Sequence, residues 1–272
     1  MVCQPEGKDM QMSIFQSISD RSDAPEIQRV RHELRQRTLK VDSVQNLTPH
    51  VIRVTLTGPD LEGFVSSSPD DHIKIFIPDL DGTPTRRDYT PRRYDPLTGT
   101  LLLDFVKHDG GPAAAWACSV KPGDHLQIAG PRGSQVITGQ IDQWLLIGDE
   151  TALPAIGRRI EELPAGASVT SVVAIPGGAD EQVFVTAAHH AAHWIYRSPE
   201  QANQADSLIA MLERIEIRDC TFVWIAAEAN VAKALRRYLL EEREITPQWI
   251  KAAGYWIKGL VGASVKDVDG GH

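Results

Sequence analysis

The stretch Arg87-Asp88-Tyr89-Thr90-Pro91-Arg92 predicts a binding surface for a flat, phosphate-bearing cofactor. Side chains alternate between two faces along an extended strand, so Tyr89 can lie against a flat ring while its neighbours reach elsewhere. Thr90 can hydrogen-bond a ring heteroatom, and Arg87 or Arg92 can pair with a phosphate through a planar guanidinium. Taken alone, the stretch fits equally well a turn with solvated charges.

A second motif follows at short range, Gly110-Gly111-Pro112-Ala113-Ala114-Ala115-Trp116. A turn of small residues that runs into an apolar stretch predicts a short helix starting near Ala113. The backbone N–H groups at such a helix start can hold a second phosphate. A ring platform beside two phosphate sites suits a flavin dinucleotide, FAD, whereas FMN needs only one such site.

These motifs resemble the siderophore-interacting, or ferric-siderophore reductase, family of the ferredoxin–NADP reductase superfamily. The Arg-x-Tyr-Thr-x-Arg pattern is similar to the family's flavin motif, and the resemblance extends from about Gln28 to Gly259. Other segments resemble the family in the same order: Arg29-Val30-Arg31, Asp70-Asp71-His72-Ile73-Lys74, Val106-Lys107-His108-Asp109, Gly130-Pro131-Arg132-Gly133-Ser134, Asp149-Glu150-Thr151-Ala152 and Gly254-Tyr255-Trp256.

The resemblance implies two sets of site residues and no catalytic acid or base. The implied contacts to FAD and the nicotinamide nucleotide are Arg87, Tyr89, Thr90, Arg92, Asp104, Val106, His108, Gly111, Pro112, Ala113, Ala114, Trp116, Asp149, Glu150, Thr151 and Glu228. The implied contacts to a ferric siderophore are Lys74, Arg132 and Lys258. At the last of these the family has a basic pair, whose first position is Ile257 here.

Two kinds of hydrophobic pattern predict two domains. Short alternating strands separated by Gly, Pro and Asp turns predict an antiparallel β-barrel as the flavin-binding domain, over residues 28–139. After Gly139, continuous apolar strands alternate with helices near Pro154 and over residues 230–244, which predicts a parallel sheet. This α/β nucleotide-binding domain covers residues 140–272, and its C-terminal segment is expected to return to the active site. Residues 1–27 look like a flexible arm.

Composition restricts the class of protein. The 272 residues carry a formal net charge of −8, which argues against a nucleic-acid or anionic-membrane binder. The sequence has no apolar run of membrane-spanning length and no secretory signal pattern, so we expect a cytoplasmic location. An anionic substrate therefore needs a local basic pocket on an acidic body.

The cysteines and histidines do not predict a metal site. Cys3, Cys118 and Cys220 lack the paired spacing of a zinc or iron–sulfur site, and we expect the last two to be reduced core residues. His189 and His193 would share a face on a helix, but no carboxylate or cysteine completes a ligand set.

The nucleotide site departs from the usual fingerprint. The second domain has no Gly-x-Gly-x-x-Gly, and Ala227 stands where the family commonly has Gly. Arg197, after an expected strand at 193–196, is a candidate for the extra phosphate of NADPH, although it also fits a surface arginine.

The resulting hypothesis is an FAD-containing, NAD(P)H-dependent ferric-siderophore reductase that releases Fe(II). A flavin or quinone reductase of the same fold, a ferredoxin-driven reductase and a non-catalytic siderophore-binding carrier remain alternatives. The sequence does not identify the siderophore or decide between NADPH, NADH and ferredoxin.

Overall fold

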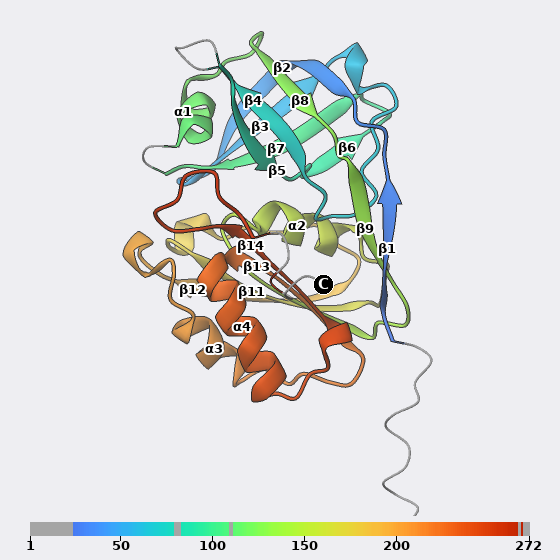
Figure 1. Cartoon of the computed structure of the whole chain (residues 1–272), viewed down its shortest axis with the longest axis vertical. Coiled ribbons are helices and arrows are strands. Elements are labelled where there is room, and N and C mark those ends of the chain that lie inside the picture. Colours follow the sequence, from blue (N-terminus) through green and yellow to red (C-terminus); the bar gives the residue numbers. More distant parts are fainter. Residues whose placement is uncertain (1–23, 79–82, 109–110, 266–267, 269–272) are drawn as a thin grey trace, which may run out of the picture.

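The protein folds into two domains, each built on its own sheet (Figure 1). The computed structural model describes residues 24–78, 83–108, 111–265 and 268. Most of the predicted arm, together with Cys3, Asp109 and Gly110, therefore lies outside the described residues. Among the described helices, none has the length and apolar character needed to cross a bilayer.

The first domain is an antiparallel sheet that curls around one hydrophobic core. Its seven strands are β2 (Gln36–Thr48), β3 (Val51–Thr57), β4 (Ile73–Ile77), β5 (Thr85–Tyr89), β6 (Arg93–Asp95), β7 (Thr100–Val106) and β8 (His125–Ala129), in the order β5-β4-β8-β2-β3-β7-β6. Alternate residues of β2, such as Leu39 and Val41, are fully buried, as the sequence pattern predicts. The predicted barrel is confirmed as a half-barrel whose end strands are β5 and β6. Helix α1 (Pro112–Ser119) packs against it.

The second domain is a parallel sheet with helices on both faces. Its strands are β10 (Gln143–Asp149), β11 (Ser168–Ile175), β12 (His189–Tyr196), β13 (Thr221–Glu228) and β14 (Ile250–Trp256), in the order β12-β11-β10-β13-β14. Helix α2 (Leu153–Glu162) covers one face, and α3 (Asp206–Leu212) and α4 (Ala229–Glu241) cover the other. Figure 1 shows α2 between the parallel sheet and the half-barrel. Helix α4 starts and ends slightly earlier than the predicted 230–244.

A two-stranded ribbon runs beside both domains (Figure 1). It joins β1 (Glu26–Arg31) to β9 (Gly133–Thr138) in antiparallel register. The chain passes from β9 directly into β10, so the ribbon lies at the connection between the domains. The sequence pattern did not indicate β1, all of whose residues are exposed.

One burial prediction was wrong. Cys118 is exposed on α1, and Cys220 is only partly buried, so they are not both core residues. The helix face that packs on the half-barrel carries Ala113, Ala114 and Ala117, which leaves the adjacent Cys118 on the outer side. In the part of the chain that the structure describes, Cys118 and Cys220 are not joined in a disulfide.

Candidate functional site

The Tyr89 ring lies at one edge of the half-barrel core. Tyr89 ends β5, and its ring centroid is 4.4 Å from that of Phe105, which is fully buried. Trp116 of α1 also packs on Phe105, with the two ring centroids 5.4 Å apart. Because Tyr89 is only half-buried, one part of it packs on the core and the rest can meet a flat ligand.

Arg87 lies two residues before Tyr89 on the same strand face. Its guanidinium donates a hydrogen bond to the Arg86 carbonyl at 2.8 Å. A Cβ atom added at Gly262 would lie 3.1 Å from the guanidinium carbon, so the C-terminal segment passes directly over Arg87. The sequence analysis did not identify Gly262, because no sequence pattern indicates that it lies beside Arg87, which is 175 residues earlier in the chain.

Thr90 is buried where the half-barrel meets the second domain. The Tyr255 side chain from β14 lies beside Thr90, which favours the ionised hydroxyl of Tyr255. Burial raises the pKa of Tyr255 well above its usual value, and the nearby Asp70 carboxylate acts in the same direction. The two predicted elements, the flavin motif and the C-terminal aromatic pair, therefore meet at this point.

Arg92 is engaged with acidic groups. Its guanidinium makes a bidentate pair with Glu161 of α2, at 2.8 and 2.6 Å, and only 5% of its side chain is exposed. Asp104 is likewise held by the fork of Arg53, at 2.7 and 2.8 Å, with Arg92 Nε at 3.9 Å. Arg92 and Asp104 thus form part of the contact between domains. Val106, also predicted in the site, is half-buried at the end of β7 opposite Val51.

The start of α1 presents backbone donors with no side-chain cap. Gly111 is its N-cap residue and Pro112 its first helical residue, so the N–H groups of Ala113 and Ala114 follow directly. The ring of His108 lies so close to Gly111 that an added Cβ would be 2.1 Å from its Cε1 atom. A side chain at 111 would therefore displace the His108 ring, and the helix start fits an external anion.

In the second domain, Asp149 connects three strand ends. Its Oδ1 atom accepts hydrogen bonds from the Thr151 N–H at 2.9 Å and from the Thr151 hydroxyl at 2.5 Å. Its Oδ2 atom accepts from the Glu228 N–H and from Trp256 Nε1, both at 2.9 Å. Asp149 thereby joins the ends of β10, β13 and β14.

Glu228 caps helix α4. Its carboxylate accepts from the N–H groups of Asn230 at 2.7 Å and Val231 at 3.2 Å. The Lys258 N–H also donates to it, at 3.2 Å. Glu228 is completely buried, so its carboxylate orients backbone rather than lining an open surface.

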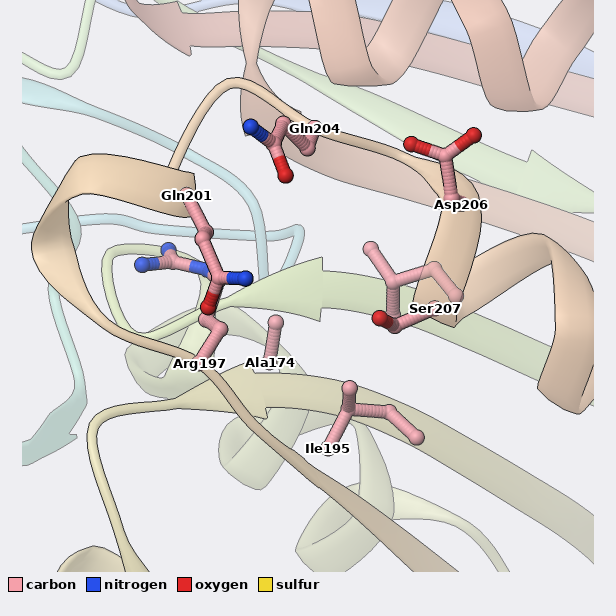
Figure 2. Close-up of a pocket in the computed structure, with 8 residues that line it drawn as sticks. Ala174, Ile195, Arg197, Gln201, Gln204, Asp206 and Ser207 are labelled. Atoms are coloured by element: carbon pink, nitrogen blue, oxygen red, sulfur yellow. The ribbon is translucent and has the colours of Figure 1, made fainter.

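Glu150 pairs with Arg197 across the end of β11. Arg197 Nη2 donates to Glu150 Oε2 at 2.8 Å. Burial raises the pKa of Glu150 to about 7, the adjacent Asp149 adds to the rise and Arg197 opposes it. Figure 2 shows Arg197 at a small pocket between the strand ends of Ala174 and Ile195 and the segment that carries Gln201, Gln204, Asp206 and Ser207.

The three predicted siderophore contacts differ in their surroundings. Lys74 lies on β4 and pairs with Asp88 of β5 at 2.7 Å. Arg132 is exposed just after β8, the strand next to β4. Lys258 Nζ instead contacts the Glu200 carbonyl and, at 3.2 Å, Asn203 Oδ1, both in the second domain. The structure places Lys74 on β4 and Arg132 just after the neighbouring strand β8, and it ties Lys258 to the other domain.

The histidine cluster lies on a strand rather than a helix. His189 and His193 are four residues apart on β12, which is about 13 Å along a strand. His190 Nε2 is 2.8 Å from the Ser171 hydroxyl. Within the described part of the chain, no group of three or more His, Cys, Asp or Glu side chains is placed to hold a metal ion.

Comparison with known families gives two matches that together cover both domains. Residues 40–84 and 79–135 match the siderophore-interacting FAD-binding domain, and residues 141–259 match the siderophore-interacting protein family. The NADPH-dependent ferric-chelate reductase of Escherichia coli strain K12 is 35% identical over 84% of this chain and 96% of its own length. The ferric vibriobactin reductase of Vibrio cholerae is 29% identical over 78% of this chain and 86% of its own.

Solved structures give the same result. A siderophore utilization protein from T. fusca superposes with a TM-score of 0.81 at 34% identity, covering 88% of this chain and 98% of its own. The siderophore-interacting protein of Aeromonas hydrophila gives 0.71 at 29% identity, covering 83% and 93%. The ferredoxin reductase of carbazole 1,9a-dioxygenase, with a TM-score of 0.63 at 17% identity over 80% of this chain and 69% of its own, shows the fold alone. The two-domain ferredoxin reductase-like prediction is confirmed, and the chain belongs to the siderophore-interacting protein family.

Proposed function

We propose that this protein is an FAD-dependent ferric-siderophore reductase that carries electrons from NADPH or NADH to an Fe(III) chelate. One observation carries the proposal: Thr90 of the flavin motif lies beside Tyr255, at the edge where the parallel strands of the second domain end. In open parallel sheets, nucleotides bind beyond these strand ends. The same junction can therefore hold a flavin and admit a nicotinamide donor.

The residues of the first domain fit FAD. Tyr89 offers a half-buried ring, Arg87 a guanidinium beside it, and the uncapped start of α1 a second anion site. Of the two arginines predicted for the first phosphate, we assign Arg87. Arg92 is buried and already bonded to Glu161.

The proposed reaction needs electron transfer and no acid–base residue. Bound FAD supplies the conversion of a two-electron hydride donor into the single electrons that Fe(III) accepts. The chain positions the cofactor through Tyr89 and Thr90 and holds Asp149 and Trp256 at the edge of the second domain. The Fe(III) chelate is the substrate, and Fe(II) is released.

The donor and acceptor are proposed from different features. The likeness to a reductase named as NADPH-dependent supports a nicotinamide donor, and Arg197 is the basic group beside the pocket of the second domain. The relative named for ferric vibriobactin supports a siderophore as the acceptor. Arg132 and Lys74 favour an anionic chelate. We place the reaction in the cytoplasm, where NADPH is available.

The first experiment identifies the cofactor. We expect the purified protein to be yellow and to release FAD, which chromatography separates from FMN after heat denaturation. Recovery of FMN alone, or failure to bind any flavin on reconstitution, contradicts the proposal.

The second experiment separates the alternatives. We expect NADPH to bleach the flavin without air and a ferric siderophore to restore its colour, with Fe(II) captured by a ferrous chelator. Bleaching by reduced ferredoxin alone supports the ferredoxin-driven alternative. Recovery of colour with a quinone but not with the chelate supports a quinone reductase, and binding of the chelate without turnover supports a carrier.

A further inference from the structure

The ion pair between Glu150 and Arg197 bridges the ends of two strands of the second sheet. Glu150 directly follows β10 and Arg197 directly follows β12, with the end of β11 between them. Their side-chain atoms are 2.8 Å apart, and only 14% and 8% of the two side chains are exposed. The Arg197 N–H is bonded to the Ile175 carbonyl at 3.0 Å, which fixes the position of its backbone.

This pair occupies the place where an open parallel sheet receives a nucleotide. The chain leaves β10 toward β11 and β12 on one side and later adds β13 and β14 on the other, so β10 is the switch point. Arg197 also lines the pocket of Figure 2, beside Gln201 and Ser207. A guanidinium fork binds one carboxylate or phosphate well, so Glu150 and a nucleotide phosphate compete for Arg197.

We propose that the Glu150 carboxylate competes with the phosphate of the nucleotide donor for Arg197. Glu150 holds Arg197 until a proton neutralises the carboxylate. Glu150 is therefore a positioning residue, which acts on the phosphate through Arg197. This inference rests on the proposed function, because it assumes a nicotinamide nucleotide as donor. The structure gives Glu150 the surroundings that such a role requires: a buried carboxylate, a cationic partner and a second carboxylate next to it.

The direction of the pH effect follows from the groups that face Glu150. Burial, Asp149 and Asp180 raise its pKa, whereas Arg197 and the backbone N–H of Glu150 lower it, and the balance of these effects places the pKa at about 7. Below pH 7 the carboxyl is mostly neutral and releases Arg197 to the phosphate. Above pH 7 the ion pair with Arg197 forms, and phosphate binding then requires the uptake of one proton by Glu150.

The test is a calorimetric titration of the flavin-loaded protein with 2′,5′-ADP, which carries the phosphates but no nicotinamide. From pH 6.5 to 8.5 the phosphate is already mostly dianionic, and we expect affinity to fall about 20-fold as Glu150 ionises. Titrations in buffers of different ionisation enthalpy should show uptake of close to one proton per ligand near the upper pH. This proton count does not depend on turnover.

Two variants separate this role from a structural one. Glu150→Gln should bind 2′,5′-ADP with nearly the same affinity across this pH range and without proton uptake. Glu162→Gln is the matched control, because Glu162 also pairs with an arginine, Arg158, but neither residue lines the pocket beside Arg197. It should keep the wild-type pH dependence. The flavin content of both variants should be unchanged.

The outcomes distinguish this inference from the proposed function. If the wild type binds 2′,5′-ADP equally well at both pH values without proton uptake, the inference is overturned while the reductase proposal stands. If the wild type neither binds 2′,5′-ADP nor is bleached by NADPH, both the nicotinamide donor and this inference fail. If Glu150→Gln does not fold, the wild-type affinities and proton count decide.

Discussion

Tyr89 packs on the half-barrel core and is also the proposed contact to the flavin. Its ring packs on Phe105 and is only half-buried. We expect Tyr89→Ala to weaken flavin binding by about 1–3 kcal/mol, because a stacked ring is lost. Tyr89→Phe keeps the ring and should keep the flavin. Fluorescence titration with FAD measures the affinity, and urea unfolding of the flavin-free proteins measures stability.

A large loss of folding stability with little loss of flavin affinity would instead identify Tyr89 as a core residue. Truncation of a fully packed aromatic ring costs about 3–5 kcal/mol of folding stability. A Tyr89→Ala protein that loses this much stability and retains its FAD affinity contradicts a flavin contact.

Asp70 makes the stability of the protein depend on pH. Burial alone would raise its pKa, but the ion pair and hydrogen bond from Lys251, with hydrogen bonds from Ser68 and Trp224, hold that pKa below its usual value. The folded state therefore keeps Asp70 ionised to lower pH than the unfolded state does. The stabilisation is present above about pH 4 and is lost as pH falls through the folded-state pKa.

Replacing Asp70 tests this dependence. Asp70→Asn leaves Lys251 of β14 buried without its carboxylate, which should cost about 3–5 kcal/mol at neutral pH. The variant should also lose less stability than the wild type between neutral and acidic pH. Urea unfolding over a pH series measures both effects. Asp42→Asn, at an exposed position of β2, is the control and should follow the wild type.

At the scale of elements, α2 fixes the half-barrel to the parallel sheet. Its Glu161 binds Arg92, and its Arg158 donates to the Ser66 carbonyl at 2.9 Å. We expect Arg92→Ala to cost about 1–3 kcal/mol of folding stability, because the partly buried Glu161 carboxylate loses its bidentate partner while Asp104 keeps Arg53. Arg87→Ala should instead lower flavin affinity. Urea unfolding measures the stability of both variants, and titration with FAD measures their flavin affinity. A larger loss of flavin affinity in Arg92→Ala than in Arg87→Ala would indicate that Arg92 binds the phosphate.

The C-terminal segment is the element that covers Arg87. Gly259 and Gly262 both have positive φ, 83° and 75°, so alanine at either position costs about 1 kcal/mol of backbone strain. Only at Gly262 does the new Cβ meet Arg87. Gly262→Ala should therefore lower the amount of bound flavin, whereas Gly259→Ala should not. Equal flavin-to-protein ratios in the two variants would show that this contact does not position the cofactor.

The sequence predicts local elements better than it predicts partners. Alternation and apolar runs located β2, β3, β7 and β11, because burial on one or both sheet faces leaves a direct pattern. The pairing of β1 with β9 depends on contacts about a hundred residues apart. The acidic partner of Arg92 is likewise 69 residues away, so a motif that names an arginine does not reveal which anion it binds.

At the scale of the whole molecule, a net charge of −8 opposes the approach of an anionic chelate. The predicted basic positions are also unequal. Lys74 is partly neutralised by Asp88, and Lys258 contacts the second domain, whereas Arg132 is exposed. Arg132 should therefore contribute most to attracting the chelate, and removal of the Asp88 charge should strengthen the contribution of Lys74.

Reoxidation of the reduced flavin, followed by stopped flow, tests this charge balance. With a triply anionic ferric catecholate at low salt, Arg132→Ala should slow reoxidation by about tenfold, since a unit charge at roughly 8 Å contributes about 0.5 kcal/mol per substrate charge. Lys74→Ala and Lys258→Ala should slow it less, and Asp88→Asn should accelerate it. At physiological salt the differences should shrink, because the Debye length is about 8 Å. A neutral ferric hydroxamate should respond little, and flavin content and reduction by dithionite should not change. Wild-type rates for all four variants with the catecholate at low salt would place the chelate elsewhere on the surface.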